Sequence, residues 1–266
     1  MTLNDNMPTP LNKQFISESL RNAGFEVEVH VLKTVESTNS WLLEGQFSSP
    51  VLLCAAEHQT VGRGRRGKTW HSPDSGVTFS LRFNRREPVN RFSGLSLLVG
   101  AVLCDSLRTF GVGDAMVKWP NDILVEGAKL AGILVESRSS GQETVLVIGM
   151  GVNYKRGAEA RMIDQASTDL NALCSSHGLP DRSELISDIG TRLIPILADV
   201  PNALIELASH WQNYDALADV PIVAKMAGEI VRGRASGIDK NGNIQIETTG
   251  GMRCLNAADI SVRPFC

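Results

Sequence analysis

The segment from Ser93 to Thr109 constrains the fold of this chain more than any other. Its apolar residues recur at helical spacing around most of the helix, and Gly111 follows as a helix stop. Such a helix needs apolar neighbours on nearly every side, so we predict a central buried helix. No segment approaches the roughly 18 consecutive apolar residues that suggest a membrane span. We therefore expect a globular protein without a membrane span or a membrane partner.

The segments around this helix alternate between strand and helix patterns. Alternating and β-branched runs predict strands at 25–32, 51–56, 76–83, 116–119, 123–125, 129–137 and 144–152. Helical spacing predicts helices at 11–23, from 40 onward behind the capping residues 37–39, and over most of 164–211 with interruptions at 178–180 and 200–201. We therefore predict an α+β fold for a domain of residues 1–215, in which helices back a mixed sheet.

The pattern of the chain changes after Asp219. Glycines at short intervals separate short alternating runs such as 229–231 and 243–247. This pattern is typical of a small all-β barrel. We expect it to form a second domain of residues 216–266.

The composition excludes several classes of function. The 26 Lys and Arg residues against 29 Asp and Glu residues give a formal net charge of -3, which argues against a surface built to bind nucleic acid. Residues 1–20 are polar and show no signal or transit peptide. The five cysteines are widely spaced, and neither they nor the five histidines have the spacing of metal ligands. We expect a cytoplasmic protein with reduced thiols and without metal ligands of its own.

A loop at Gly62–Lys68 places four cations and three glycines within seven residues. Glycines let backbone N–H groups approach an anion closely, and arginines bind carboxylate or phosphate in a bidentate way. The loop therefore suits a ligand that carries phosphate. Although Gly62–Thr69 matches the spacing of a Walker loop, a strand follows it where a Walker loop needs a helix. A solvated basic turn and a nucleic-acid patch remain alternatives for this segment alone.

Three further segments carry polar groups at defined places. Pro120 makes Lys118–Asp122 a rigid turn that projects an asparagine and an aspartate. Lys129–Glu136 is an apolar strand that opens with a lysine, and Gly149–Tyr154 has two glycines that leave little bulk on one face. Taken singly, each segment has an ordinary structural explanation: a turn, an exposed strand end or a packed bend.

The order of these segments closely resembles the catalytic domain of biotin protein ligases. The resemblance is carried by Ser37-Thr38-Asn39, by Gln59 with Gly62–Trp70 and the following His71-Ser72-Pro73, by Lys118–Asp122, by Lys129–Glu136 and by Gly149–Asn153. It covers about residues 30 to 266, because the segment around Gly233–Asp239 resembles the small SH3-like C-terminal domain of the same family.

The resemblance implies a reaction in two steps. ATP would activate the carboxylate of biotin as biotinyl-5'-AMP with release of pyrophosphate. The biotinyl group would then pass to one lysine of the biotin carboxyl carrier protein of acetyl-CoA carboxylase, and AMP would leave. The basic loop suits this chemistry, because fixed cations stabilise the charge that develops as pyrophosphate departs.

The resemblance also implies which residues meet biotin: Ser37, Thr38, Asn39, Gln59, Arg63, Gly64, Arg65, Lys129 and Gly132. The first four match positions that hydrogen-bond the ureido ring, a neutral group with donors and acceptors. Arg63, Gly64 and Arg65 would bind biotin and the acyl phosphate, and Arg65 is the best single candidate for holding the adenylate.

The residues implied for ATP are Arg66, Lys68, Trp70, Asn121 and Asn153. Trp70 would stack on adenine and Asn153 would meet its polar edge. The two cations would face phosphates, and Asn121 would help there with a magnesium ion brought by ATP. The family commonly has arginine where Lys68 stands, so this position departs from the pattern.

The catalytic residues implied are Arg65, Lys129, Asp122 and Lys118. Lys129 would contact the carboxylate and the bridging phosphate oxygen. Asp122 would orient the amine of the carrier lysine or accept its proton. Lys118 would support the site from a less direct position.

Some members of the family carry an additional N-terminal winged-helix domain and repress transcription. Only 36 residues precede Ser37, so we expect a ligase without operator binding. We expect a monomer or a weak homodimer. Two alternatives stay open: a lipoate or octanoate transferase, and a nucleic-acid-binding regulator that uses the basic loop. The glycines of that loop suggest that it orders when ligand arrives.

Overall fold

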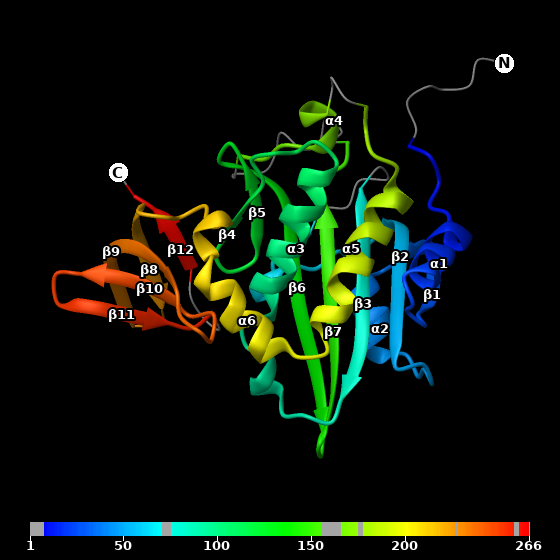
Figure 1. The fold of residues 1–266 in the computed structure, drawn as a ribbon, viewed down its shortest axis with the longest axis horizontal. Helices are drawn as coiled ribbons and strands as arrows, with labels where there is room; N and C mark the ends of the chain where they lie inside the picture. Colours follow the sequence, from blue (N-terminus) through cyan, green and yellow to red (C-terminus); the bar gives the residue numbers. More distant parts are fainter. Residues whose placement is uncertain are drawn as a thin grey trace.

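Seven strands form one mixed sheet in the order β1-β2-β3-β7-β6-β5-β4 (Figure 1). The computed structural model describes residues 8–70, 76–155, 166–174, 178–226, 228–257 and 261–265. The strands are β1 (Glu28–Val35), β2 (Val51–Gln59), β3 (Val77–Arg85), β4 (Met116–Lys118), β5 (Asp122–Val125), β6 (Ala128–Ser140) and β7 (Glu143–Val152). Strands β1 and β2 are parallel and the other neighbouring pairs are antiparallel, which confirms the predicted mixed sheet.

Helices cover both faces of this sheet. The helices of the domain are α1 (Lys13–Asn22), α2 (Thr38–Glu44), α3 (Leu95–Thr109), α4 (Leu170–Leu173), α5 (Arg182–Ile196) and α6 (Val200–Ser209), with short 3-10 turns η1 (Arg65–Gly67), η2 (Val89–Phe92) and η4 (Trp211–Asn213). The side chains of β2 alternate between the two faces of the sheet, so they pack into two different apolar clusters. Leu53 and Ala55 join the main core with α1, α3 and α5, whereas Leu52 and Cys54 pack with Leu42 of α2.

Helix α3 is the predicted central helix, and nearly all of its side chains are buried. Within the described residues, one helical segment is long and apolar enough to cross a membrane: Val89–Thr109, which includes α3. Because 67% of its most apolar 18-residue stretch is buried inside the protein, it serves as a core helix.

Helix α2 is short, and it is held at both ends. Ser37 caps its N-terminus, where the hydroxyl accepts the Ser40 N–H at 3.4 Å. At the other end Arg82 of β3 donates to the carbonyl oxygens of Leu42 at 3.2 Å and Gly45 at 3.0 Å. Burial lowers the pKa of Arg82 from its usual value. The polar residues at the start of α2 therefore have a fixed position over the sheet.

The region predicted as mostly helical, 164–211, differs in two ways. Residues 166–169 run extended beside β6, because the Lys129 N–H donates to the Ala166 carbonyl at 2.9 Å and the Thr168 N–H donates to the Lys129 carbonyl at 3.0 Å. The segment Val200-Pro201 begins α6 and does not interrupt a helix, since proline fits the first turn, where its missing N–H costs nothing. Residues 164–165 and 175–177 lie outside the described part.

The C-terminal sheet confirms the predicted small β unit. Its strands are β8 (Pro221–Met226), β9 (Glu229–Ile238), β10 (Ile244–Thr248), β11 (Gly251–Leu255) and β12 (Ser261–Pro264), in the order β11-β10-β9-β8-β12. It lies beside β4 and α6, at the opposite end of the molecule from α1 (Figure 1). The Trp119 indole donates to the Gly242 carbonyl at 3.0 Å, which ties this sheet to the seven-stranded one. The expected boundary after residue 215 stays a prediction.

The cysteines that the structure describes are all free thiols, of which Cys54, Cys104 and Cys174 are buried and Cys254 is exposed. Burial raises the pKa of Cys54 and of Cys104 to about 12. These two thiols therefore stay protonated and unreactive near neutral pH, as core residues. Cys266 lies outside the described residues.

Arg182 in α5 generates a stability prediction. Its guanidinium is almost fully buried, pairs with Glu57 at 2.7 Å and donates to the carbonyl oxygens of Thr9 and Gly76. Replacing Arg182 by leucine leaves these acceptors without a donor, so we expect a loss of about 3 kcal/mol in urea unfolding. On the same helix, Arg192→Leu breaks an exposed pair with Asp188 and an exposed hydrogen bond to Thr109 Oγ1, and should cost about 1 kcal/mol or less. Equal losses in the two variants would contradict this account.

Candidate functional site

A cavity of about 800 Å³ opens between the catalytic sheet, the Gly62–Lys68 loop and the end of β12. The residues proposed from the sequence all line it: Ser37, Thr38, Asn39, Gln59, Arg63, Gly64, Arg65, Arg66, Lys68, Trp70, Lys118, Asn121, Asp122, Lys129, Gly132 and Asn153. These residues come from several separate segments of the chain, and the fold brings the segments together around one cavity.

The floor of the cavity is a part of the sheet that has no side chains. Gly132 of β6 pairs with Gly151 of β7, and Gly149 lies two residues from Gly151 on the same face. On the strand next to β7, Ser80 of β3 pairs with Gly149. On the strand next to β6, Asp122 of β5 pairs with Gly132. One face of the sheet therefore carries a bare centre with polar groups on both flanks.

Two of these glycines make room for specific side chains. A Cβ added at Gly149 would lie 2.3 Å from Asn39 Oδ1, and one added at Gly151 would lie 2.4 Å from Trp70 Cε2. Real Cβ atoms do not approach other atoms so closely, so any larger residue would displace these partners. The sequence pattern of two glycines with little bulk on one face thus has a physical reason.

Hydrogen bonds order the polar group at the start of α2. The Thr38 N–H donates to Gln59 Oε1 at 2.8 Å, and Ser80 donates its hydroxyl proton to Asn39 Oδ1 at 2.6 Å. Thr38 Oγ1 lies 2.7 Å from Ser80 Oγ and 3.1 Å from Gln59 Oε1, so its one hydroxyl proton is shared between these two contacts. All four side chains are buried. This end of the cavity can therefore pair with a neutral ligand group that has both donors and acceptors.

The glycine–arginine loop closes as a tight turn. The Lys68 N–H donates to the Arg65 carbonyl at 3.2 Å, and both central residues, Arg66 and Gly67, have positive φ, which is the geometry of a type I′ turn. The segment that follows, as far as the structure describes it, starts no helix, so the Walker-like spacing has no Walker geometry. The segment 71–75, which includes His71-Ser72-Pro73, lies outside the described residues.

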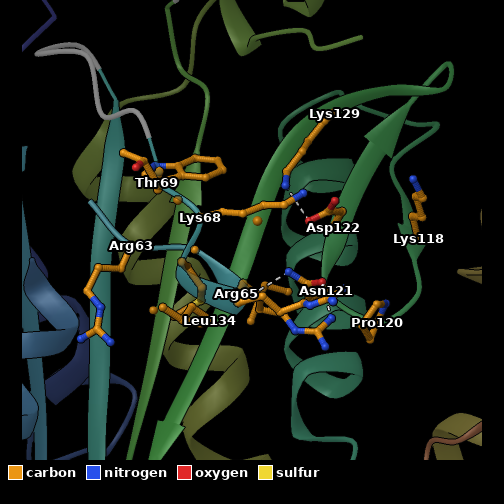
Figure 2. A pocket seen from close by; sticks show the side chains of 18 of the residues that line it. Arg63, Arg65, Lys68, Thr69, Lys118, Pro120, Asn121, Asp122, Lys129 and Leu134 are labelled. Carbon is orange, nitrogen blue, oxygen red and sulfur yellow. Dashed lines mark hydrogen bonds and ion pairs between the residues drawn. The ribbon is translucent and has the colours of Figure 1, made fainter. Parts of the chain in front are cut away.

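Two arginines of the loop point in different directions (Figure 2). Arg65 donates to Asn121 Oδ1 at 3.1 Å and to the Ala257 carbonyl of the C-terminal domain. Arg63 instead pairs with Glu136 at 2.8 Å and donates to Ser40 Oγ at 3.1 Å. Arg65 thus lies toward the charged end of the cavity, and Arg63 lies toward α2.

The charged end is built around one ion pair. Lys129 Nζ donates to Asp122 Oδ1 at 2.6 Å (Figure 2). The same Nζ lies 5.6 Å from the ring centre of Trp70. Burial lowers the pKa of Lys118, and the nearby cations Lys129, Arg263 and Lys68 lower it further, against the opposing effect of Asp122. Several cations gathered around one carboxylate make this end suited to a polyanion such as a phosphate chain.

Asn153 can offer a ligand fewer hydrogen bonds than the sequence suggests. Its amide nitrogen donates to the Lys129 carbonyl at 3.1 Å and to the Thr168 carbonyl at 3.0 Å. Both amide protons therefore hold the chain beside β6, and only the side-chain oxygen is left to meet a ligand.

The sequence did not identify Ser80, Glu136 and Arg263 as site residues. Ser80 and Glu136 support Asn39, and Arg263 lines the cavity. Ser80 lies in an apolar strand, and only the β3–β7 register places it beside Gly149. Glu136 belongs to the Lys129–Glu136 motif, which could have drawn attention to it, whereas Arg263 reaches the cavity through the docking of the C-terminal sheet.

No group of three or more His, Cys, Asp or Glu side chains within the described ranges is arranged to hold a metal ion. Among the described residues that line the cavity, Asp122 has the one carboxylate. Such a site fits a magnesium ion held chiefly by the phosphates of a nucleotide, because Mg²⁺ commonly takes only one or two protein carboxylates there.

Comparisons with known proteins agree with this geometry. Residues 31–153 match the biotin/lipoate A/B protein ligase family, and residues 220–263 match the biotin protein ligase C terminal domain. The chain is 33% identical over 241 residues to the bifunctional ligase/repressor BirA of Escherichia coli, a match that covers 88% of this chain and 74% of that protein. It is 29% identical over 270 residues to the biotin–[acetyl-CoA-carboxylase] ligase of Mycobacterium tuberculosis, covering 98% of each.

A solved structure of similar fold is the biotin protein ligase from Aquifex aeolicus in complex with biotin and ATP. The TM-score is 0.75 at 24% sequence identity, and the match covers 90% of this chain and 99% of that chain. At this identity the likeness supports the fold, and the sequence relatives carry the family assignment.

The glycine floor generates a prediction. In Gly151→Ala the new Cβ must push the Trp70 indole away, so the indole N–H resonance of Trp70 in an NMR spectrum should shift strongly. The matched control is Gly113→Ala, where an added Cβ has no atom within 4 Å. A Trp70 resonance that is the same in Gly151→Ala and in the wild type would contradict the packing described here.

Proposed function

This chain belongs to the biotin/lipoate A/B protein ligase family, and from that premise we propose that its cavity joins biotin to a carrier protein at the expense of ATP. The enzyme is a biotin–[acetyl-CoA-carboxylase] ligase in type. The observation that carries the proposal is one cavity with a neutral hydrogen-bonding end at Thr38–Asn39 and a cationic end at Lys129. Biotin has a ureido ring at one end and a carboxylate at the other, so the two ends match.

We propose that the ureido ring lies over Gly149, next to the ordered side chains of Thr38, Asn39 and Gln59, with Ser37 at the rim. Asn39 Oδ1 is an acceptor there, since both of its amide protons are used by the Leu134 carbonyl and by Glu136. It would therefore accept a ureido N–H. The floor at Gly132 lets the ligand's chain pass close to the sheet toward the cations.

The first chemical step takes place at the cationic end. A carboxylate oxygen of biotin attacks the α-phosphorus of ATP, the bond to the β-phosphate oxygen breaks, and pyrophosphate leaves. Two anions must meet, so fixed cations lower the barrier as charge builds on the α-phosphate. Lys129 and Arg65 are the residues that we propose for this role, with the Gly64 backbone beside them. Arg63 would act from the α2 side.

We propose that the nucleotide lies across Trp70, with the Asn153 oxygen at the amino group of adenine. Arg66, Lys68, Lys118 and Asn121 would face the phosphates, together with Arg263 from the C-terminal domain. A magnesium ion bound to ATP would neutralise part of the phosphate charge, with Asp122 as the available carboxylate.

The second step transfers the biotinyl group. The neutral amine of the carrier lysine attacks the acyl carbon of biotinyl-5'-AMP, the bond to the phosphate oxygen breaks, and AMP leaves. We propose that Asp122, held by Lys129 at 2.6 Å, orients this amine and accepts its proton. The carrier would be the biotin carboxyl carrier protein, in the cytoplasm. A monomeric or weakly dimeric state and the lack of nucleic-acid binding stay predictions.

Lipoate or octanoate is the second candidate, because the matched family includes lipoate ligases. The neutral end of the cavity disfavours such a ligand. An apolar dithiolane or alkyl end would leave buried polar groups such as Asn39 and Gln59 without ligand partners, and that costs far more than a small change in apolar contact.

The proposed adenylation predicts biotin-dependent exchange of labelled pyrophosphate into ATP. Arg65→Ala and Lys129→Ala each remove a cation from the developing charge, so exchange should fall about a hundredfold or more. Lys225→Ala, at an exposed position on β8, is the control and should exchange like the wild type. Exchange with lipoate or octanoate in place of biotin would assign the protein to the second candidate.

The pKa of Lys118 predicts a pH dependence of nucleotide binding. Burial lowers this pKa, so the amine loses its proton at a lower pH than an ordinary lysine. Because phosphates bind the charged form, ATP affinity should fall as the pH rises, at a pH below the usual lysine pKa of about 10.4. In Lys118→Arg the cation persists and this fall should disappear from calorimetric titrations. Identical pH profiles for wild type and variant would rule out Lys118 as the titrating group.

A further inference from the structure

Glu136 of β6 holds two parts of the cavity wall at once. Its Oε1 pairs with Arg63 Nη2 at 2.8 Å, and its Oε2 accepts from Asn39 Nδ2 at 2.9 Å. The Glu136 side chain is 18% exposed and that of Arg63 is 46% exposed, so the contact with Asn39 is better shielded from water than the pair with Arg63. One carboxylate therefore joins the neutral end of the cavity to the glycine–arginine loop.

On the Asn39 side, Glu136 fixes which end of the amide faces the ligand. Asn39 Oδ1 accepts from Ser80 at 2.6 Å, and Nδ2 donates to Glu136 and to the Leu134 carbonyl. Turning the amide over would place its oxygen against the Glu136 carboxylate, which is repulsive. The carboxylate thus keeps Asn39 Oδ1 as the acceptor above Gly149.

On the loop side, Glu136 and Ser40 hold Arg63 apart from the other loop cations. Figure 2 shows Arg63 directed away from Lys68, Lys129 and Asp122. The neighbouring Arg65 is anchored separately, on Asn121 and Ala257. The loop therefore has two anchors, and the one through Arg63 leads to the residues proposed for the ureido ring.

We propose that Glu136 is a positioning residue that couples occupancy of the neutral end of the cavity to the conformation of the Gly62–Lys68 loop. It rests on the proposed function, since the occupant is biotin. A ligand that bonds to Asn39 Oδ1 stabilises the Asn39–Glu136 arrangement, and through it the Arg63 anchor. Glu136 itself touches neither substrate; it acts through Asn39 and Arg63.

The chemistry of the side chain makes the link testable. Two donors, from Asn39 and from Arg63, face two carboxylate oxygens. Glutamine has the same shape but offers one acceptor and one donor, so in Glu136→Gln one contact must become a donor facing a donor. The variant removes the coupling while it preserves the volume of the side chain.

The test is hydrogen–deuterium exchange of peptides covering residues 59–70, with and without saturating biotin. In the wild type, biotin should slow exchange in the loop; in Glu136→Gln at saturating biotin this protection should be lost. In pyrophosphate exchange, the KM for biotin should rise roughly tenfold, as for the loss of one charge-assisted hydrogen bond, and the KM for ATP should stay within about twofold. A merely structural role would change both KM values together.

Glu143→Gln is the matched control. Glu143 lies on the same β6–β7 hairpin and forms an exposed pair with Arg86 at 3.7 Å, far along the strands from the glycine floor. Its loop protection and its KM for biotin should equal those of the wild type. Should Glu136→Gln fail to fold, Arg63→Ala cuts the same link from the loop side, and loop protection by biotin should again be lost.

Combining Arg63→Ala with Glu136→Gln should raise the KM for biotin no further than the more severe single variant, because both interrupt one connection. Full loop protection by biotin in Glu136→Gln, or additive effects in the double variant, would overturn the coupling. If calorimetry shows that the wild type does not bind biotin, the proposed function fails, and the inference with it. Biotin binding with an uncoupled loop defeats the inference alone.

Discussion

The site depends on the pairing of Gly132 with Gly151 across β6 and β7. This register leaves the middle of the sheet bare and sets Gly149 one step away on the same face. The side chains of Trp70 and Asn39 occupy positions that a Cβ at Gly151 or Gly149 would exclude. The glycines therefore let Asn39 and Trp70 pack directly on the sheet, and these two side chains form the surface on which a ligand can lie.

The groups around this bare floor are sorted by charge. Neutral polar side chains from α2, β2 and β3 are bonded to one another at one end, so little rearrangement is needed to receive a neutral ring. Cations from the loop, from β4 and β6 and from β12 meet at the other end, where Asp122 is the opposing charge. The C-terminal sheet takes part in this end, through Arg263 and through the Ala257 carbonyl on Arg65. Under the proposed function, this division would let one cavity bind a neutral head group and activate an acidic tail.

Local sequence patterns predicted much of this structure, because the information is local. The apolar period of 93–109, the cap of α2 and the turn at Pro120 each depend on residues close in the chain, and each forms. The helix behind the cap begins at Thr38, two residues earlier than expected, because Ser37 alone is the capping residue. Ser80 and Glu136 gain their roles from strand register and from contacts across the sheet, which no local pattern contains. For the same reason the extended run at 166–169 was mistaken for helix: its partner is β6, not a neighbour in sequence. The role of each site residue rests on the resemblance and on the geometry together.

A crystal structure of the protein with biotinyl-5'-AMP bound tests the central claim most directly. We expect the ureido ring above Gly149 with one N–H on Asn39 Oδ1, the acyl phosphate between Lys129 and Arg65, and adenine against Trp70. A complex with the ureido ring at the Lys129 end, or with the ligand away from the glycine floor, would contradict it.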